Sequence, residues 1–498
     1  MRGKNNRPWS CSLFALLTML IILPSCQSPA GRSAGTTVVG QPAVEPLVSQ
    51  VVHPEWSRDL AIYEVNVRQF SAEGTFTGFA AHLPRLKEMG VGILWLMPIH
   101  PIGQKNRKGT LGSYYSVRDY YGINPEFGTP EEFRALVDRI HGMGLYVIID
   151  WVANHSAWDN PLTMRYPDWY MRDSQGRFFP PVPDWSDVID LNFSSSGLRD
   201  YLAEAMAYWV REMDVDGFRC DVAGMVPMDF WDRVRGELEQ IKPVFLLAEA
   251  EGPEYHHRAF DMTYAWGLHH VLNGIAAGDR TAGDLSRYLE AERQRYPAGA
   301  YRMNFTSNHD ENSWNGTVFE RLGDSAELMA ILTATLEGMP LIYSGQEAGL
   351  DHRLEFFEKD LIEWRDHSFA GLYTQLLHLK KENRALWNGE WGGRVERVAT
   401  SDDEAVFAFL RRKGDDRILA VMNLTGELRE VSLSAGTFVG TYRDVFTNEQ
   451  VALQEGASLT LGPWGYGLYS KPVEQVAAPD RRSQGARGPE EKQGIGEK

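Results

Sequence analysis

Cysteine and basic residues are scarce in this chain of 498 residues. Two of its three cysteines, Cys11 and Cys26, lie close to the N-terminus, so Cys220 is left alone and no internal disulfide framework can form. The 50 Lys and Arg residues against 67 Asp and Glu give a formal net charge of −17. An acidic surface repels phosphate backbones, and we therefore expect no nucleic-acid partner. A cluster of metal-ligand histidines is also lacking, which argues against a metal-dependent hydrolase.

The apolar run Leu13–Leu23 follows three basic residues and has the length of a signal peptide rather than of a membrane span. It ends in Leu-Pro-Ser-Cys, which resembles a bacterial lipobox and predicts a lipoprotein-type signal peptide over residues 1–26. Lipidated Cys26 would anchor the protein to a membrane without spanning it. The alternative is an ordinary secretory signal with an incidental cysteine. With the lipobox we expect export across the inner membrane and attachment in the bacterial envelope, facing the periplasm or the cell surface.

Composition divides the rest of the chain. Residues 27–55 are rich in small and polar residues and are typical of a flexible tether. Residues 473–498 are poor in apolar residues and predict a disordered tail. Between them, the patterns predict a large α/β domain over 56–388, with a small inserted domain at 155–190, and a β domain over 389–472.

In the large domain, strand-like apolar runs alternate with amphipathic helical stretches. The runs are almost continuously apolar, which is typical of parallel strands buried on both faces. We count eight strand–helix units, which predicts a (β/α)8 TIM barrel with a short, irregular insertion after the third strand. The predicted strands are Ala61–Val67, Val91–Met97, Leu145–Asp150, Gly217–Asp221, Val244–Glu249, Phe260–Thr263, Arg302–Thr306 and Leu341–Ser344.

Local signals support this reading of the large domain. Thr129, Pro130 and Glu132 have the pattern of an N-cap, a first-turn proline and a capping-box acid, so a helix should begin there.

Beyond residue 390, short alternating runs separated by turns predict a C-terminal antiparallel β-sandwich. Its expected strands lie at Val398, Ala405–Leu410, Arg417–Met422, Leu428–Leu433, Gly440–Asp444 and Leu459–Leu461.

Acidic residues stand where the predicted barrel strands end, namely Asp150, Asp221, Glu249, Asp261 and Asp310. The carboxyl ends of barrel strands form the active-site face. A single acid at such a place often caps the next helix. Several acids from different strands in one cleft are costly, because like charges repel, and they call for a functional reason.

Two of these acids have neighbours that predict a catalytic role. Arg219 and Asp221 are two residues apart on one strand, so both face the barrel interior, and the guanidinium should keep the carboxylate ionised as a glycosidase nucleophile requires. A structural ion pair is the alternative. Glu249 ends an apolar run, where burial should raise its pKa as suits a general acid. Glu251 has the same parity and is its competitor, and a helix-capping role is the other alternative.

The acids belong to four blocks, which follow one another along the chain: Asp150-Trp151-Val152-Ala153-Asn154-His155, Gly217-Phe218-Arg219-Cys220-Asp221, Glu249 alone, and Phe305-Thr306-Ser307-Asn308-His309-Asp310. In residues and order, these blocks resemble the hallmark blocks of the α-amylase superfamily (glycoside hydrolase family thirteen). The resemblance covers about residues 58–470, and it implies a TIM-barrel enzyme that hydrolyses O-glycosyl bonds.

The resemblance implies retaining hydrolysis of α-1,4-glucosidic bonds in starch or maltodextrins, through a covalent glycosyl-enzyme. Asp221 would be the nucleophile, Glu249 the acid/base and Asp310 the stabiliser of the transition state. The expected substrate-binding residues are Tyr115 as an aromatic platform, Asp150 and His155 around the sugar, and Arg219 and His309 as supports of the acids.

The chain also departs from the family pattern. Val222–Met225 replaces a Lys-His pair that contacts sugar and calcium in many members, and Ser113-Tyr114 replaces a His-Gly pair. No cofactor is required by the chemistry. Structural calcium with Asn154 as a ligand is one interpretation, and a loop-bracing role for Asn154 is the other. A transglycosylase or isomerase acting on α-glucosides is the alternative function. A non-catalytic carbohydrate-binding relative is disfavoured because all three acids are present.

Overall fold

The computed structural model describes residues 48–434 and 436–471. The signal peptide, the lipidation site at Cys26, most of the tether and the tail predicted from the sequence lie outside the described residues. Within those two described ranges, no helix is long and apolar enough to cross a membrane.

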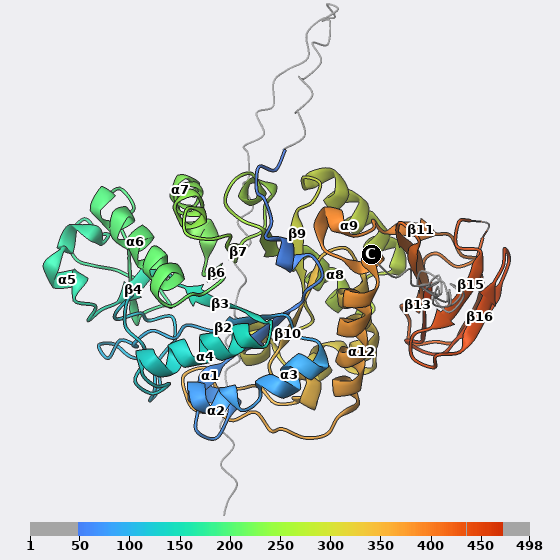
Figure 1. Ribbon diagram of the computed structural model, residues 1–498, viewed down its shortest axis with the longest axis horizontal. Helices are drawn as coiled ribbons and strands as arrows, with labels where there is room; N and C mark the ends of the chain where they lie inside the picture. The colour runs from blue at the N-terminus through green and yellow to red at the C-terminus, as the bar shows by residue number, and fades with distance from the viewer. Residues whose placement is uncertain (1–47, 435, 472–498) are drawn as a thin grey trace, which may run out of the picture. The chain divides into compact units, whose positions relative to one another are not determined.

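Eight parallel strands close into a barrel, which confirms the fold predicted from the sequence (Figure 1). All eight predicted strands are present, with bounds that differ by a few residues. In order around the barrel they are β1 (Ile62–Val65), β10 (Met339–Tyr343), β9 (Tyr301–Asn304), β8 (Met262–Tyr264), β7 (Phe245–Ala248), β6 (Gly217–Cys220), β3 (Tyr146–Trp151) and β2 (Ile93–Leu96).

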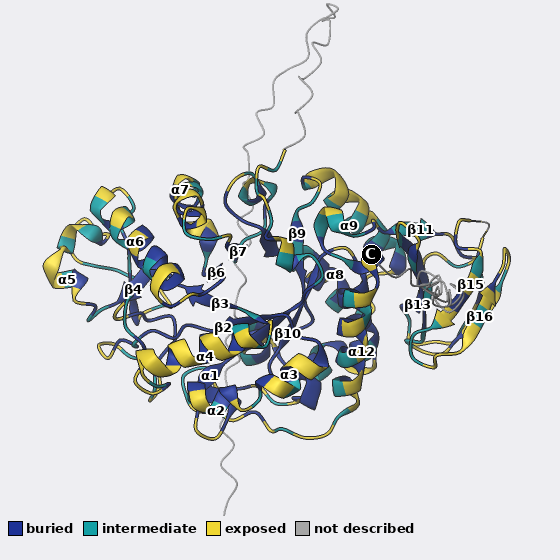
Figure 2. Cartoon of the chain, in the orientation of Figure 1, coloured by how far each residue is buried: buried dark blue, intermediate teal, exposed yellow. Residues whose placement is uncertain are grey.

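Helices cover the outside of the barrel, with buried inner faces and exposed outer faces (Figure 2). The predicted start of α4 is confirmed: the Thr129 hydroxyl accepts a hydrogen bond from the backbone of Glu132, whose carboxylate accepts one from the backbone of Thr129. The longer helices are α3 (Leu83–Met89), α4 (Pro130–Gly142), α6 (Ser196–Glu212), α7 (Met228–Glu239), α8 (Trp266–Ala276), α9 (Ala282–Arg295), α11 (Ala326–Thr335) and α12 (Ser368–Glu382).

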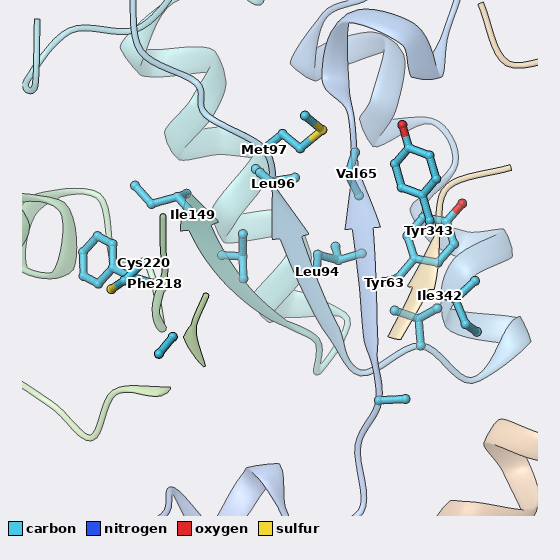
Figure 3. Close-up of a cluster of buried hydrophobic side chains, with 14 of the residues drawn as sticks. Tyr63, Val65, Leu94, Leu96, Met97, Ile149, Phe218, Cys220, Ile342 and Tyr343 are labelled. Atoms are coloured by element: carbon cyan, nitrogen blue, oxygen red, sulfur yellow. The ribbon is translucent and has the colours of Figure 1, made fainter. Parts of the chain in front are cut away.

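Alternate residues of each barrel strand face opposite sides, as the two-residue period of a strand requires. Figure 3 shows side chains of one side, among them Tyr63, Leu94, Phe218 and Cys220, which belong to the large apolar core between strands and helices. The intervening residues, including Trp95, fill the interior. For the same reason, the Cys220 thiol points towards the helices, and the side chains of Arg219 and Asp221 point to the interior.

The inserted segment is more regular than the sequence suggested. After β3, strand β4 (His155–Ala157) pairs antiparallel with β5 (Val188–Asp190), and α5 (Leu162–Arg165) lies between them in sequence. Strands of three residues are too short to show an alternating pattern, so the expectation of a purely irregular insertion was wrong. The pairing holds His155 opposite Asp190 at the edge of the barrel mouth.

The C-terminal domain consists of two antiparallel sheets that share one apolar core, which confirms the predicted sandwich. Strands β16 and β18 were not anticipated, although β18 pairs with β13 along six residues. The larger sheet has the order β11 (Glu396–Val398), β12 (Val406–Lys413), β13 (Asp416–Asn423), β18 (Tyr466–Lys471), β15 (Gly440–Asp444) and β16 (Gln450–Leu453), and the smaller one pairs β14 (Arg429–Ser432) with β17 (Ser458–Leu461).

Candidate active site

Arg219 lies at the centre of a buried carboxylate cluster at the carboxyl end of the barrel. Its Nη1 donates to Asp221 Oδ1 at 2.8 Å and to both carboxylate oxygens of Asp150 at 3.0 and 3.2 Å. Its Nη2 lies 2.9 Å from Oε1 of Glu249 but is not aligned for a hydrogen bond, so that contact is an ion pair only. Arg219, in β6, is fully buried, and its predicted pairing with Asp221, which directly follows the end of this strand, is confirmed.

Burial and mutual repulsion raise the pKa values of the acids around Arg219. Burial raises the pKa of Glu249 to about 7, against the opposing effect of Arg219, which agrees with the sequence-based expectation. Burial also raises the pKa of Asp221 to about 7 and that of Asp150 to about 6, although Arg219 lowers both. For Asp221 the net direction is opposite to the expectation, because one guanidinium does not offset burial and neighbouring carboxylates together. Because these acids interact, the apparent pKa values belong to the cluster as a whole and not to single residues.

The loop after β6 holds Glu249 in place. Its Oε2 accepts a hydrogen bond of 2.6 Å from the backbone N–H of Val222. Val222 has a φ of 37°, in the left-handed region that a β-branched residue rarely adopts. Such strain persists only where surrounding contacts enforce it, and it is common at functional sites. Glu251 instead pairs with Arg302 at 2.5 Å, so the structure brings Glu249 and not its competitor to Arg219.

His309 forms a second charged group at the same end of the barrel. Burial lowers its pKa, but Asp310 and Glu64 outweigh that effect and raise it to about 9. Its Nδ1 lies 2.5 Å from Oε1 of Glu64, and its Nε2 lies 2.8 Å from the Tyr115 hydroxyl and 3.4 Å from Asp310. His309 is therefore a cation between two acids, and Asp310 is brought beside it.

Tyr115 connects the carboxylate cluster around Arg219 with the charged group around His309. Its hydroxyl donates to Oδ2 of Asp150 at 3.1 Å, and its ring stacks on His309 with centroids 5.5 Å apart.

Glu64 was missed by the sequence analysis. The available signal was an acid within the otherwise apolar strand β1, where it is fully buried.

His155 lies at the edge of the cluster, with Nε2 4.0 Å from Oδ2 of Asp221. Burial lowers the pKa of His155 to about 3, so the ring is neutral. The adjacent Asn154 is buried, and its amide nitrogen lies 3.4 Å from Nδ1 of His155. Calcium takes six to eight oxygen ligands, usually including carboxylates. Across the described part of the chain, no group of three or more His, Cys, Asp or Glu side chains is placed to share a metal ion, so a metal role for Asn154 stays a prediction.

Asp261 does not belong to the site, contrary to the sequence-based expectation. Strand β8 begins at Met262, one residue after Asp261, so this acid lies at the opposite end of its strand from the active-site face. Its carboxylate pairs with Arg235 at 2.5 Å and with His53 at 2.9 Å, and it accepts a hydrogen bond from the backbone of Leu246. Asp261 is therefore a structural group. It stands near the start of both the predicted strand, Phe260–Thr263, and the observed one, so counting it among the acids at strand ends was wrong.

Comparisons with known proteins agree with this geometry. A family model described as "Alpha amylase, catalytic domain" matches residues 56–187 and 161–422, and one described as "Maltogenic Amylase, C-terminal domain" matches residues 397–468. A "noncanonic maltogenic alpha-amylase AmyB from Thermotoga neapolitana" has a similar solved structure, with a TM-score of 0.77 and 33% identity over 84% of this chain and 99% of that one. An alpha-amylase from Lactobacillus plantarum has a TM-score of 0.74 and 31% identity over the same shares.

A curated relative, "Alpha-amylase MalA" of Haloarcula japonica, is 28% identical over 407 residues, or 77% of this chain. This chain spans 58% of the length of MalA. The barrel, the acid cluster and these relatives define the protein as a glycoside hydrolase. The chain belongs to the alpha-amylase family, and its C-terminal domain is similar to that of maltogenic amylases.

Proposed function

We propose that the chain is a retaining hydrolase of α-1,4-glucans such as starch or maltodextrins. The observation that carries the proposal is the bridge at Arg219, which lies 2.8 Å from Asp221 and 2.9 Å from Glu249. Two carboxyl groups that share one guanidinium favour the short separation of retaining enzymes, about 5–5.5 Å, over the about 6.5–9.5 Å that admits a water molecule in inverting ones. The names of the relatives, alpha-amylase and maltogenic alpha-amylase, support the substrate class.

In the first step, protonated Glu249 gives its proton to the glycosidic oxygen while ionised Asp221 attacks the anomeric carbon. The bond from that carbon to the glycosidic oxygen breaks, the reducing-side sugar leaves, and Asp221 becomes covalently bound to the other part of the chain. Glu249 and Asp221 both have a pKa raised to about 7, so one proton is held by the pair near neutral pH, and the reactive form carries it on Glu249. The contact with Arg219 orients Asp221 for attack.

In the second step, Glu249 accepts a proton from water, and the resulting hydroxide displaces Asp221 from the anomeric carbon. The configuration of the sugar is retained because the carbon is inverted twice. His309 and Asp310, which lie 3.4 Å apart, would bind hydroxyls of the sugar at the cleavage point, and the Tyr115 ring, stacked on His309, would lie beneath it. Asp310 additionally supplies negative charge near the developing oxocarbenium ion.

Proton NMR of the full-length chain with maltoheptaose tests this function. We expect α-anomeric products in the first minutes, before mutarotation, and none from an Asp221→Asn variant. Initial β-anomeric products would contradict retention. Products longer than the substrate would instead indicate a transglycosylase.

For location, we propose that Cys26 is lipidated after cleavage of the preceding signal peptide. The support is the sequence alone, in which Leu-Pro-Ser-Cys follows a short apolar run. In bacterial cells, the wild-type chain should incorporate labelled fatty acid and sediment with membranes. A Cys26→Ala variant should do neither, and labelling of that variant would refute the proposal.

A further inference from the structure

Few side-chain contacts hold Asp310, the expected stabiliser of the transition state. Its side chain is 36% exposed, and within the described residues its carboxylate makes one charged contact, with His309 at 3.4 Å. The segment that carries Asp310 runs from the end of β9 to the start of α10 (Val318–Leu322). The position of the carboxylate therefore depends on the contacts that fix the backbone of this segment.

A single turn of π-helix, η5 (Glu311–Asn315), directly follows Asp310. Its defining hydrogen bond runs from the backbone N–H of Gly316 to the carbonyl of Glu311 at 2.9 Å. π-helical turns are rare in proteins and frequently lie at functional sites. Because Asp310 and this unusual turn are adjacent in the chain, contacts that hold the turn also hold the backbone of Asp310.

The carboxylate of Glu311 is buried against α8 and α10. Its Oε2 lies 3.2 Å from Nε2 of His269 on α8 and 3.8 Å from Nη1 of Arg321 on α10, and its Oε1 accepts a hydrogen bond of 3.0 Å from the amide of Asn315. Burial raises the pKa of Glu311, but the contacts with His269 and Arg321 outweigh burial and place the pKa below its ordinary value. Glu311 is therefore ionised at neutral pH and connects the π-helical turn to two helices.

The backbone of the turn closes around Asp310. The N–H of Glu311 donates to Oδ1 of Asn308 at 2.8 Å, and the N–H of Asn312 donates to the carbonyl of Asn308 at 3.0 Å. Asn308 is fully buried. These two hydrogen bonds span His309 and Asp310, so the position of the turn determines the position of both residues.

Arg321 joins both ends of the segment that contains Asp310. Its Nη2 donates to the carbonyl of Thr306 at 2.6 Å, and its Nε donates to the carbonyl of Gly316 at 3.0 Å. Its Nη1 donates to Oδ1 of Asn273 on α8 at 2.9 Å. One planar guanidinium thus closes residues 306–316 into a loop and attaches the loop to a helix that covers the barrel. The single nitrogen of a lysine cannot reproduce this geometry.

His269 fixes the end of β9 from the same helix. Its ring stacks on that of Phe305 with centroids 4.7 Å apart and an interplanar angle of 16°, and its Nδ1 lies 3.3 Å from the carbonyl oxygen of Phe305. Its Nε2 faces Glu311. The imidazole therefore connects the residue that follows β9 with the turn that follows Asp310.

We infer that Glu311, His269 and Arg321 form a buried charged network of positioning residues, which holds Asp310 where it stabilises the transition state. The inference rests on the proposed glucan hydrolysis. The three side chains are at most 11% exposed and act through the backbone of residues 306–316 rather than on the sugar. A displacement of about 1 Å at a reacting group costs about a hundredfold in rate, so a network remote from the sugar has a large effect on turnover.

Steady-state kinetics of Arg321→Lys on maltoheptaose test the inference. The variant keeps the charge but loses the fork that spans the two carbonyls, so we expect kcat to fall roughly tenfold or more while KM changes less. Glu311→Gln removes only a charge, should act in the same direction, and replaces Arg321→Lys if that variant does not fold. Arg287→Lys is the matched control and should keep the wild-type kcat, because Arg287 also pairs with an acid but is 67% exposed on α9.

A double-mutant cycle separates the positioning of Asp310 from a general effect on the fold. α-Maltosyl fluoride is a suitable substrate, because fluoride leaves without a proton and slow variants remain measurable. If Arg321 acts through Asp310, adding Arg321→Lys to Asp310→Asn should change kcat/KM by less than about twofold. Losses that multiply in the double variant would show that Arg321 acts on another group and would overturn the inference.

Hydrogen exchange followed by mass spectrometry gives a readout that does not depend on turnover. In Arg321→Lys, exchange should become faster in residues 306–316 and stay at the wild-type rate in α12. Faster exchange with an unchanged kcat would show that the network holds a loop without serving catalysis, and unchanged exchange would show that it does not hold the loop. Either result overturns the inference. If the wild type cleaves neither maltoheptaose nor α-maltosyl fluoride, the proposed hydrolysis fails, and the exchange of residues 306–316 alone supports or refutes the network.

Discussion

Arg219 in β6 and Asp221, which directly follows this strand, form a 2.8 Å hydrogen-bonded ion pair at the carboxyl end of the barrel. Because Arg219 also contacts Asp150 and Glu249, a single cation stands among three carboxyl groups that are at most 15% exposed. Its planar fork holds Asp150 and Asp221 with Nη1 and Glu249 with Nη2, which an ammonium group cannot do. The nucleophile, the acid and their common cation are therefore one electrostatic unit.

An Arg219→Lys variant should lose at least about a hundredfold in kcat/KM on maltoheptaose, since the charge remains but the fork is lost. Steady-state kinetics check this, with thermal unfolding to confirm that the variant folds. Arg233→Lys is a matched control, because Arg233 also pairs with two acids but lies partly exposed on α7. Near wild-type activity in Arg219→Lys would mean that geometry at this cation does not matter.

The activity should fall as the pH rises through about 7. Glu249 has to be protonated to act as the acid, and burial raises its pKa to about 7, above the usual range of a glutamate. On the acid side, activity should fall as Asp221 becomes protonated, and the two apparent pKa values belong to the pair. The pH profile of kcat/KM measures both. With an activated aryl glycoside, Glu249→Gln should lack the alkaline decline, and an unchanged decline would assign it to another group.

Asp221→Asn should stabilise the sugar-free protein, and more so at pH 8 than at pH 5. Burial is the main cause that raises the pKa of Asp221 to about 7 in the folded protein, from the ordinary value of 3.8 for an aspartate. The folded state therefore binds more protons than the unfolded chain between these values, so the carboxyl group costs stability as pH rises through that range. Thermal unfolding should show a gain on the order of a few degrees at pH 8. A larger gain in stability at pH 5 than at pH 8 would contradict a raised pKa of Asp221 in the folded protein.

Glu64→Gln should weaken catalysis although Glu64 does not contact substrate, because Glu64 acts through His309. Loss of this carboxylate removes one of the two acids that raise the pKa of His309 to about 9. We expect kcat/KM to fall about tenfold or more, with an added decline above pH 7 as His309 loses its proton. Rescue by Glu64→Asp and NMR titration of the His309 ring distinguish this from a structural defect. An unaltered His309 titration would contradict it.

Much of the barrel could be predicted because its strands are nearly pure apolar runs. Eight such runs, alternating with helical stretches, leave few other folds. Strand β18 was missed because Tyr466–Lys471 mixes polar and apolar residues, and its place is decided by pairing with β13. Asp261 was wrongly grouped with the active-site acids because β8 has three residues, so its two ends are close together in the sequence.

The acids of the site could be predicted because chemistry requires them at strand ends. The pairing of Glu64 with His309 could not be predicted, since the two residues are 245 positions apart and only the closed barrel brings them together. The aromatic cluster of Trp314, Phe356 and Tyr115 was missed for the same reason. Phe356 contacts Trp314 and Tyr115, which are far apart in the sequence and come from two other loops.

The join between the barrel and the C-terminal domain depends on Arg411. This buried side chain donates to the carbonyls of Thr335 and Leu336 at the end of α11, and to those of Trp387 and Gly393. Burial lowers its pKa to about 10, which leaves it charged at neutral pH. The helix end would otherwise have unpaired carbonyls in a dry interior.

Replacing Arg411 by leucine should therefore lower stability by about 2 kcal/mol or more, because several buried acceptors lose their donor. Urea unfolding followed by fluorescence measures the loss. Arg412→Leu is the matched control, since the neighbouring Arg412 is 37% exposed and pairs with Glu396, and it should change stability by less than about 1 kcal/mol. Activity per folded molecule should stay at the wild-type level in both variants, because neither residue contacts the carboxylate cluster. Equal stability losses in the two variants would show that the carbonyls near Arg411 find other donors.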